Sequence, residues 1–279
     1  MPRRLTRWTD PREDGDNPLE RAALIRDADV LTMVDRALTA GEVMLAFQPV
    51  MQARSPGQVA FYEGLVRVLD ATGRVIPAAQ FMAAAETTEL GRKLDCQALH
   101  LALRALQSHQ GLRLSINMSA RSIAYKPWQK ILNSHLRRNP SVGERLILEI
   151  SEASAMTLPD IVSGFMAEQQ EKGICFALDE YGSGLASVKY LKDFYFDAAK
   201  IDGPLIRGIH ADADLQVTVA ALISVARHFD MFTVANLVED RADADMLTQM
   251  GVDCLQGYLY GSPSVRPPWE AKPPSRLFG

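Results

Sequence analysis

The chain has 279 residues, of which 47% are hydrophobic and 23% charged, and its formal net charge is −4. This is an ordinary globular composition, and the length is sufficient for one α/β barrel with its own core. The surplus of acid argues against a nucleic-acid duplex as partner, because duplex binding depends largely on basic side chains that neutralise phosphates. No hydrophobic run is long enough to cross a bilayer, and the basic start MPRRLTRW continues as DPREDGD rather than as a secretory signal. With three scattered cysteines, we expect a cytoplasmic protein without a membrane partner.

The amino-terminal region is predicted to contain a disordered segment and one helix. Residues 1–17 mix charges with proline and glycine, which disfavours fixed structure. The next helix is predicted over residues 18–40, because Asn17 can cap it and Pro18 suits its first position. Apolar residues then recur at helical spacing up to Gly41. The helix is expected either to pack on the domain behind it or to bind a partner, for example in a homodimer.

Strand-like and helical segments alternate through the rest of the chain. The predicted strands are 43–50, 59–68, 112–117, 145–150, 174–179, 196–201, 231–236 and 252–258, and the predicted helices include 79–108, 159–171, 213–228 and 240–249. Such alternation predicts a mostly parallel sheet, and eight strands favour a closed, TIM-like (β/α)8 barrel.

The first two strands should depart from this parallel arrangement. The link QARSPGQ between them is too short for a crossover helix, so we expect one antiparallel strand near the start of the barrel. The barrel domain, with its amino-terminal helix, is predicted to cover residues 18–263. The proline-rich segment 264–279 is expected to be an exposed tail or linker, because it contains two Pro-Pro pairs.

Polar residues interrupt or end successive predicted strands. Glu63 lies inside an apolar run, and Asn117, Glu149, Asp179 and Lys200 each close a different strand. A single acid there could simply cap the next helix, but functional side chains of α/β barrels gather at the carboxyl ends of several strands. Carboxylate and amide oxygens suit hard cations such as Mg²⁺, Mn²⁺ or Ca²⁺. The pattern therefore predicts one shared metal site.

A lysine beside such a site suggests metal-assisted phosphodiester chemistry. Two bound metals can generate hydroxide and hold both oxygens of an in-line phosphoryl displacement, with Lys200 orienting the water or stabilising charge. The alternative is that Lys200 forms a structural ion pair with Asp197 or Asp202.

The glycines of LDEYGSGLASVKYL allow two interpretations. Gly182-Ser183-Gly184 between a strand and a helix imitates a dinucleotide-binding loop, but Ser187 stands where that loop has a third glycine. Two acids also precede the loop and would repel a pyrophosphate. A flexible loop over an acidic metal site fits this segment better.

In this context the chain from about residue 30 to 263 resembles the EAL domain, a family that hydrolyses the bacterial second messenger cyclic di-GMP. The matching segments, in chain order, are FQPV (47–50), YEGLVR (62–67), NMS (117–119), LEISE (148–152), LDEYGSG (178–184), KID (200–202), VANLVE (234–239) and QGYLYGSP (256–263). The resemblance implies Mg²⁺ or Mn²⁺ as cofactor and cyclic di-GMP as ligand.

The resemblance also implies roles for individual residues. Metal ligands are implied at Glu63, Asn117, Glu149, Asp179 and Glu180, the last standing where the family has a second aspartate. Lys200 matches the lysine that supports the catalytic water. Nucleotide contacts are implied at Gln48, Leu65, Arg67 and Glu239, with the arginine on phosphate and Glu239 on the guanine side. Glu152 matches a residue that braces the loop 182–187.

Four positions depart from the family pattern. Gly64 replaces the usual alanine of the signature tripeptide, and Glu180 adds one methylene to the expected aspartate. Asn236 replaces the glutamate expected to bind the metal-water cluster and act as base, and an amide cannot accept a proton at neutral pH. Leu237 replaces a glycine and adds bulk beside the pocket.

These departures favour one functional hypothesis over a second. The first is a degenerate EAL domain that binds cyclic di-GMP as a signalling receptor or interaction module, with weak or no hydrolysis and a weakened or lost metal site. The second is an active metal-dependent phosphodiesterase that produces linear pGpG, in which Glu180 or Glu239 compensates for Asn236. Neither hypothesis identifies a protein partner.

Overall fold

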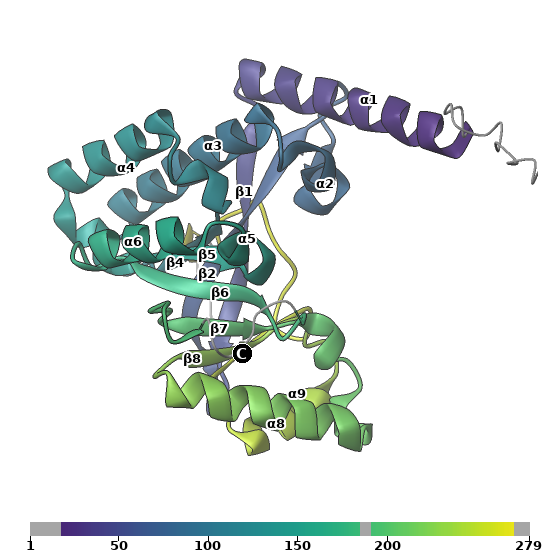
Figure 1. The fold of residues 1–279 in the computed structure, drawn as a ribbon, viewed down its shortest axis with the longest axis vertical. Coiled ribbons are helices and arrows are strands. Elements are labelled where there is room, and N and C mark those ends of the chain that lie inside the picture. Colours follow the sequence, from purple (N-terminus) through teal and green to yellow (C-terminus); the bar gives the residue numbers. More distant parts are fainter. Residues whose placement is uncertain (1–17, 185–190, 271–279) are drawn as a thin grey trace, which may run out of the picture.

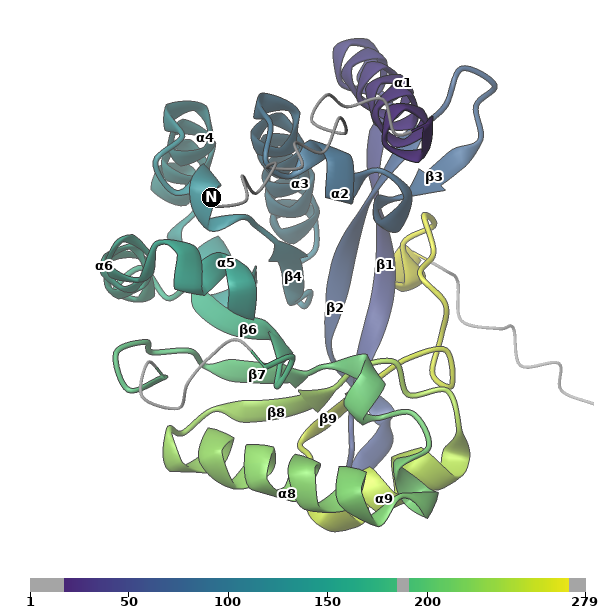
Figure 2. The ribbon, with the colours of Figure 1, turned by 45° about the vertical axis from the view of Figure 1, so that its right-hand side comes forward.

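The chain forms a closed barrel of strands surrounded by helices (Figure 1, Figure 2). The computed structural model describes residues 18–184 and 191–270, with side chains from Ile25 onward. The predicted disorder of residues 1–17, the cap at Asn17 and part of the predicted loop 182–187 lie outside the described residues. Within the described ranges, no helix is long and apolar enough to span a membrane.

The strands pair in the order that a barrel with one reversed strand requires. They are β1 (Val43–Gln52), β2 (Ser55–Leu69), β3 (Val75–Pro77), β4 (Leu114–Asn117), β5 (Leu146–Ser151), β6 (Cys175–Tyr181), β7 (Ala198–Ile201), β8 (Phe232–Ala235) and β9 (Cys254–Gln256). Neighbours from β2 and β4 through to β9 are parallel, whereas β1 is antiparallel to both β2 and β9 and so closes the ring. The short β3 extends β2 as an antiparallel hairpin outside the ring. The predicted eight-stranded barrel with one antiparallel strand is therefore confirmed.

Helices cover the outside of the barrel. They are α1 (Pro18–Ala40), α2 (Met82–Ala85), α3 (Glu89–Ser108), α4 (Lys126–Arg138), α5 (Glu152–Thr157), α6 (Pro159–Gln170), α8 (Ala213–His228) and α9 (Arg241–Met250). The helix predicted over 18–40 is confirmed, and it packs on the barrel through the fully buried Val34 and Ala37. Its amino-terminal part extends beyond the rest of the fold (Figure 1).

One predicted helix is divided in the structure. The range 79–108 contains a short turn of 3-10 helix, then α2, and then α3, whose start is set by Thr88. The Thr88 hydroxyl accepts a hydrogen bond from the backbone N–H of Leu90, at 3.1 Å, and so caps α3. The structure also contains α4 and α5, which the sequence-based prediction did not include.

The segment after the barrel packs against it, which corrects the expectation of an exposed tail for residues 264–270. Ser264 pairs with Phe47 of β1 through two backbone hydrogen bonds of 2.8 and 3.0 Å. The Trp269 ring then lies edge-on against Phe47 and Tyr62, with ring centroids 4.6 and 5.1 Å apart. Aromatic pairs in this geometry contribute beyond their buried area, so this segment belongs to the folded unit.

Gly257 provides a test of the packing at the end of β9. A Cβ atom at Gly257 would lie 2.0 Å from the carbonyl oxygen of Val238, a backbone atom that cannot move aside cheaply. We expect Gly257→Ala to lower the free energy of unfolding by about 1–3 kcal/mol or more, as overpacking does. Urea denaturation followed by circular dichroism measures this change. The matched control is Gly111→Ala, where a Cβ meets nothing within 4 Å; a similar loss in both variants would contradict the packing argument.

Candidate functional site

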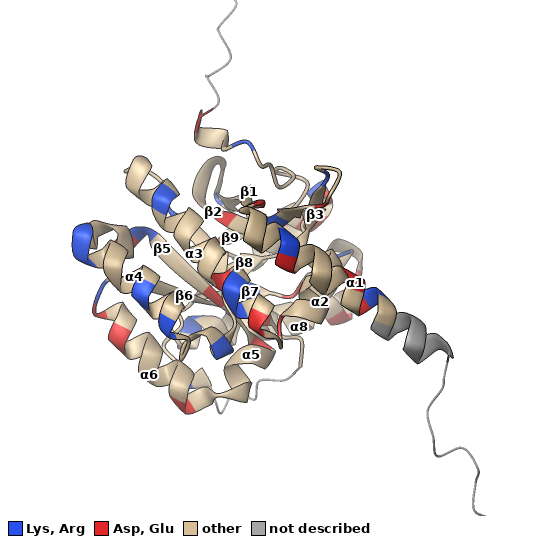
Figure 3. Cartoon of the chain, turned by 90° about the horizontal axis from the view of Figure 1, so that it is seen from above, with Lys and Arg blue, Asp and Glu red and all other residues tan. Residues whose placement is uncertain are grey.

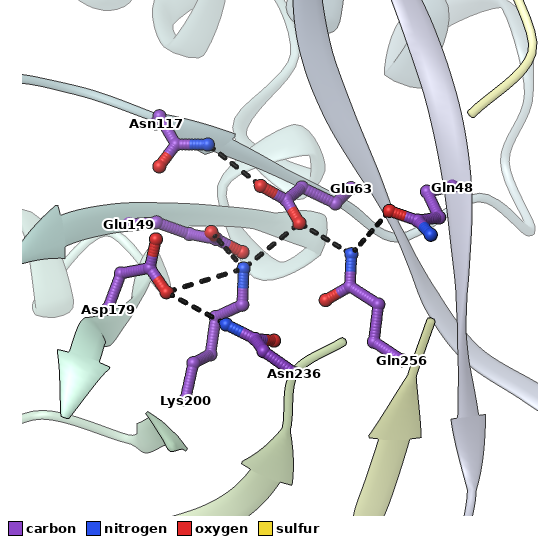
Figure 4. A network of polar contacts seen from close by, with 8 residues as sticks. All are labelled: Gln48, Glu63, Asn117, Glu149, Asp179, Lys200, Asn236 and Gln256. Carbon is purple, nitrogen blue, oxygen red and sulfur yellow. Dashed lines mark hydrogen bonds and ion pairs between the residues drawn. The ribbon is translucent and has the colours of Figure 1, made fainter. Parts of the chain in front are cut away.

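The parallel strands bring the predicted polar residues together at one end of the barrel. Glu63 is on β2, Asn117 on β4, Glu149 on β5, Asp179 on β6 and Lys200 on β7, and these strands are successive neighbours in the sheet. Figure 4 shows the five side chains pointing toward one another, with dashed contacts among them. The predicted gathering of strand-end residues into one site is thus seen in the structure.

Lys200 lies at the centre of this cluster and is almost completely buried. Its ammonium group donates to Glu149 Oε2 at 2.5 Å and to Glu63 Oε2 at 3.0 Å, and it lies 3.8 Å from Asp179 Oδ1. Burial opposes its charge, but the three carboxylates outweigh burial and raise the pKa of Lys200 well above its usual value. The lysine is therefore the fixed positive charge of the site.

The alternative prediction, an ion pair of Lys200 with Asp197 or Asp202, is wrong. The ammonium group of Lys200 pairs with the carboxylates of the barrel interior, and neither Asp197 nor Asp202 is among its partners in the described residues. Asp197 instead accepts a hydrogen bond of 2.8 Å from the backbone N–H of Phe176.

Glu63 is buried and is held ionised by its surroundings. Burial alone would raise its pKa, but the Lys200 charge and hydrogen bonds from Gln256, Lys200 and Asn117 keep the pKa of Glu63 below its usual value. The Asn117 Nδ2 donates to Glu63 Oε1 at 2.8 Å, and Gln256 Nε2 donates to Glu63 Oε2 at 2.6 Å. Every oxygen of this carboxylate thus has a donor.

Glu149 behaves in the opposite way although it shares the same lysine. Complete burial, followed by repulsion from the Glu63 charge, raises the pKa of Glu149 to about 8. Its Oε1 is buried and has no hydrogen-bond partner within the described residues. This carboxyl group therefore holds a proton more readily than Glu63 does, and it retains an oxygen without a partner that faces the site.

Asn236, directly after β8, interacts with the same cluster. Its Nδ2 donates to Asp179 Oδ1 at 3.1 Å, while its Oδ1 is buried without a hydrogen-bond partner in the part of the chain described. The carboxylate of Asp179 can only accept, so charge selects the orientation in which the amide nitrogen faces it. The amide thus joins two strand ends through one hydrogen bond.

Leu237, the residue after Asn236, occupies a strained backbone conformation. Its φ is +54°, in the left-handed region that favours glycine and that costs other residues roughly 1–2 kcal/mol. Its side chain is 49% exposed and packs against Gly203, where an added Cβ would lie 2.2 Å from Leu237 Cδ1. A large apolar side chain therefore stands at the rim of the site.

Glu180 and Glu152 lie at the edge of the network rather than in it. Glu180 is exposed, has a φ of +57° and lines the same pocket as Asp179. Burial and the neighbouring Asp179 charge raise its pKa. Glu152 is buried at the start of α5 and accepts a hydrogen bond of 3.0 Å from the backbone N–H of Gly182. This contact fits the predicted bracing of the loop that begins at Gly182.

The four residues predicted to contact nucleotide differ in burial and in their distance from the polar cluster. Gln48 is buried, accepts a hydrogen bond from Gln256 at 3.3 Å and donates to the Gly261 carbonyl at 3.0 Å. Leu65 lines the pocket beside Asn117 and Asp179.

Arg67 and Glu239 lie toward the rim. Arg67 follows Glu63 and Leu65 on the same face of β2, because side chains alternate along a strand. Burial lowers its pKa, although the charge of Glu63 opposes this. Glu239 is exposed and pairs with Arg207 at 3.2 Å.

The residue types at the centre fit a hard divalent cation, but the arrangement as it stands is closed around Lys200. The unused oxygens Glu149 Oε1 and Asn236 Oδ1 are acceptors that lack donors within the described residues. The described residues nevertheless contain no group of three or more acids, histidines or cysteines already arranged to hold a metal. We therefore expect a cation at Glu63, Asn117, Glu149 and Asp179 to compete with the lysine ammonium group for the same oxygens.

Two polar residues of this region are missing from the sequence-based prediction. Gln256 bridges Glu63 and Gln48 from β9, and the motif QGYLYGSP contains it. Asp95 of α3 is buried beside the pocket and accepts hydrogen bonds from Ser122 Oγ at 2.5 Å and from the Ser119 N–H at 3.1 Å. Asp95 belongs to a helical apolar pattern, so the sequence gives no signal that its carboxylate reaches this pocket.

The pocket itself opens beside the acidic cluster. Its volume is about 220 Å³, and its lining includes Leu65, Asp95, Asn117, Asp179 and Glu180. It thus joins the strand ends of β2, β4 and β6 to α3, and it gives a ligand access to the polar cluster.

Fold and cluster together define the class of protein: an α/β barrel with one reversed strand and a polar site at the carboxyl ends of its parallel strands. A family model described as the EAL domain matches residues 31–263. The chain therefore belongs to the EAL domain family, as its motifs indicate.

Curated relatives carry names from cyclic di-GMP metabolism. The chain is 28% identical over 234 residues to cyclic di-GMP phosphodiesterase PdeB of Shewanella oneidensis, covering 82% of this chain and 27% of that protein. It is also 28% identical to cyclic di-GMP phosphodiesterase PdeF of Escherichia coli, covering 84% of this chain and 32% of PdeF. The chain thus spans about a third or less of the length of these two relatives.

Two solved structures that resemble this chain contain the nucleotide. The FimX EAL domain from Pseudomonas aeruginosa bound to c-di-GMP is 26% identical, with a TM-score of 0.77, and the match covers 85% of this chain and 97% of that one. The PaMucR phosphodiesterase in complex with c-di-GMP is 27% identical, with a TM-score of 0.73 and the same coverages. One neighbour is therefore named as an enzyme and the other by its domain and ligand.

The buried Asp95 predicts a pH dependence of stability. Burial raises the pKa of Asp95 from 3.8 to about 7, so between these values the folded state binds the extra proton and stability falls as pH rises. We expect Asp95→Asn, which keeps an acceptor for Ser119 and Ser122, to stabilise the protein at pH 8 relative to wild type by up to about 4 kcal/mol. At about pH 4 the gain should vanish, because wild-type Asp95 is then protonated in the folded state. Urea denaturation at both pH values measures the difference, and equal effects at both would refute the prediction.

Proposed function

We propose that this EAL domain binds cyclic di-GMP as a signalling receptor or interaction module and hydrolyses it weakly or not at all. The observation that supports this proposal is the hydrogen bond from Asn236 Nδ2 to Asp179 Oδ1, at 3.1 Å. At this position the family pattern implies a glutamate that acts as base. The amide donates where a base must accept, and it cannot take a proton from water at neutral pH.

The electrostatics of the pair support the same proposal. A glutamate at position 236 would place a second carboxylate against Asp179, and like charges at this distance are tolerated when a cation lies between them. The asparagine removes the repulsion and supplies a donor instead. The pair is therefore stable without a second cation, and one reason for the site to hold two metals is gone.

The position of Glu180 adds a second argument. Its longer side chain replaces the aspartate implied for the second metal, and it is exposed at the pocket rather than joined to the buried cluster. Coordination demands oxygen positions within a few tenths of an ångström, so an added methylene changes the fit. Glu180 thus alters the position implied for the second metal and Asn236 alters that of the implied base, whereas Glu63, Asn117 and Glu149 keep the residue types of the family.

Retention of the nucleotide-contact residues supports binding. Gln48, Leu65 and Arg67 lie on β1 and β2 around Glu63, and the two similar structures named above contain c-di-GMP. The half-buried Arg67 guanidinium offers paired donors for a phosphate, a geometry for which arginine is well suited. The acidic cluster next to it would repel that phosphate unless a cation or Lys200 offsets the charge.

In this proposal each polar residue has a defined task toward the ligand. A divalent cation, Mg²⁺ or Mn²⁺, held by Glu63, Asn117, Glu149 and Asp179 would neutralise a phosphate and polarise its ester bond. Lys200 would orient water near that phosphate, and Glu152 would hold the loop at Gly182 in place. Asn236 would hold Asp179 in place by its hydrogen bond. Because the amide cannot accept a proton, it would not deprotonate the water that attacks the phosphate.

The alternative proposal is an active phosphodiesterase that produces linear pGpG. The names of PdeB and PdeF favour it, and Glu180 lines the pocket beside Asp179. In that case Glu180, whose pKa is raised by burial and by the Asp179 charge, would act as the base. The two proposals differ in which residue takes the proton.

Restoring the glutamate tests the first proposal. We expect wild-type protein to bind cyclic di-GMP with Mg²⁺ or Mn²⁺ present and to release little pGpG. In Asn236→Glu, turnover should rise by about 10²-fold or more, because a general base commonly contributes 10²–10⁴-fold. Calorimetry measures the binding and chromatography of the nucleotide products measures the turnover.

The matched control is Asn236→Gln, which has the length of glutamate without its basicity and should remain as slow as wild type. Rapid wild-type hydrolysis that is lost in both Glu63→Ala and Glu180→Gln would establish the alternative. If no nucleotide binds with either metal, both proposals fail.

The nucleotide-contact set has its own test in Arg67. Removal of one charged partner of a phosphate costs about 1.5–3 kcal/mol, so Arg67→Ala should raise the Kd for cyclic di-GMP by about 10- to 100-fold. Calorimetric titration measures the affinity. Arg54→Ala, at an exposed arginine in the β1–β2 turn, should leave it unchanged. Equal affinity in the two variants would show that Arg67 does not contact the ligand.

A further inference from the structure

One stretch of this acidic protein carries no acid at all. Between Asp95 and Glu144 the sequence contains neither aspartate nor glutamate over 48 residues. At the average of the chain, 34 acids in 279 residues, about six would fall in this stretch. Seven basic residues occur there instead, namely Arg104, Arg113, Arg121, Lys126, Lys130, Arg137 and Arg138.

The fold places most of these charges on one side of the barrel, along α3 and α4. The side chains of Lys93, Arg104, Lys126, Lys130, Arg137 and Arg138 are exposed on these two helices, and we call this set the basic face. In Figure 3, α4 carries blue segments and no red. Within the described residues no member of the basic face forms an ion pair.

Helical spacing places part of the basic face beside a groove. Lys93 and Arg104 are three turns apart on one stripe of α3. On α4, Arg138 lies two turns beyond Ile131 on the stripe that faces α3, since residues seven apart share a helix face. Lys126, Lys130 and Arg137 form a second stripe of α4, turned outward from Ile131, so the charges run along both helices beside and above the groove.

The groove itself lies between α3, α4 and the end of α1. It has a volume of about 260 Å³, and its lining includes Leu38, Lys93, Cys96, Tyr125 and Ile131. The lining is mixed: Leu38, Cys96, Pro127 and Ile131 offer apolar contact, and Thr39, Lys93 and Gln97 add polar groups. One acid, Asp35 of α1, also lines the groove.

The basic face has a rigid aromatic element beside this groove. The Arg92 guanidinium lies over the ring of Tyr125, 5.6 Å from its centroid, and such a contact holds both side chains in place. A rigid, partly apolar groove flanked by unpaired cations is suited to an amphipathic segment that brings both carboxylates and an apolar anchor.

We propose that the groove between α3 and α4, with the basic face around it, docks an acidic amphipathic helix of a partner protein. Carboxylates of the partner would pair with the basic face, and one apolar side chain would enter the groove beside Leu38 and Ile131. This inference is independent of nucleotide hydrolysis, because none of these residues belongs to the cluster around Lys200.

The shape and composition of the face favour a protein over a membrane or a nucleic-acid duplex. The described large apolar side chains that are exposed, such as Ile25, Val217 and Phe232, all lie outside α3 and α4. A membrane contact would therefore lack the aromatic or aliphatic groups that normally enter the lipid interface. A duplex presents phosphates to a basic face but no apolar group for the groove.

The test measures binding of a synthetic, fluorescein-labelled helical peptide with glutamates on one face and leucines on the other. Fluorescence anisotropy with the full chain should show binding that weakens with added salt, since the charges are exposed. In Lys93→Glu/Lys130→Glu the Kd should rise by at least about tenfold. The matched control, Arg54→Glu/Arg74→Glu, reverses two exposed arginines outside the basic face and should retain the wild-type Kd.

Further probes distinguish the apolar contribution of the groove from the contribution of the charges. They also distinguish a protein partner from a lipid surface or a DNA duplex. A peptide with serines in place of the leucines should bind at least about tenfold more weakly, because the apolar anchor is lost. The proposal is overturned if the acidic peptide fails to bind wild type, or binds both reversal variants equally. Tighter, salt-dependent binding to phosphatidylglycerol vesicles or to a DNA duplex than to the peptide would likewise overturn it in favour of that partner. Thermal unfolding of each variant shows that the reversals leave the fold intact.

Discussion

The arrangement of the site depends on one buried charge, the ammonium group of Lys200 among the carboxylates of Glu63, Glu149 and Asp179. These side chains come from strands that are far apart in the sequence, so the contact can form when the barrel is closed. Removal of one partner from a buried ion pair typically costs about 3–5 kcal/mol, because the remaining charge is left uncompensated. Apolar residues of similar volume would stabilise the interior at least as well as these buried charges. The presence of the charges therefore indicates a function at this site.

The neighbours of this charge make the carboxylates unequal. Glu63 has donors on both oxygens and a lowered pKa, whereas the pKa of Glu149 is raised to about 8 and one of its oxygens is unused. Asp179 differs from both, because it accepts a hydrogen bond from the neutral amide of Asn236. A site with one carboxylate of lowered pKa, one of raised pKa and one bound to an amide differs from a symmetric pair of metal positions. This difference, together with the strained Leu237 at its rim, underlies the proposed shift from hydrolysis to recognition.

Much of the fold could be predicted from the sequence because its signals are local. The alternation of apolar runs predicts the strands, and the short link QARSPGQ (52–58) predicts that the first two strands are antiparallel. The strand-end rule also predicts which polar residues meet. The rest depends on tertiary packing. Thr88 divides a continuous helical pattern through a single capping hydrogen bond, Trp269 holds a proline-rich segment against β1, and Asp95 reaches the pocket from a helix whose pattern is that of ordinary core. The partners of Lys200 could not be chosen from the sequence, because Asp197 is close to it along the chain but does not pair with it in the fold.

The reversed first strand also has a consequence for how the protein is made. Strand β1 is completed on one side by β2, its neighbour in sequence, but on the other side by β9, about two hundred residues later. A chain emerging from the ribosome therefore presents an early hairpin whose outer edge has no partner until the last strand appears. Open edges of this kind pair readily with other chains, and long-range closure is slow compared with local folding. Pairing of β1 with β9 is thus the step that covers this open edge and protects the nascent domain from aggregation.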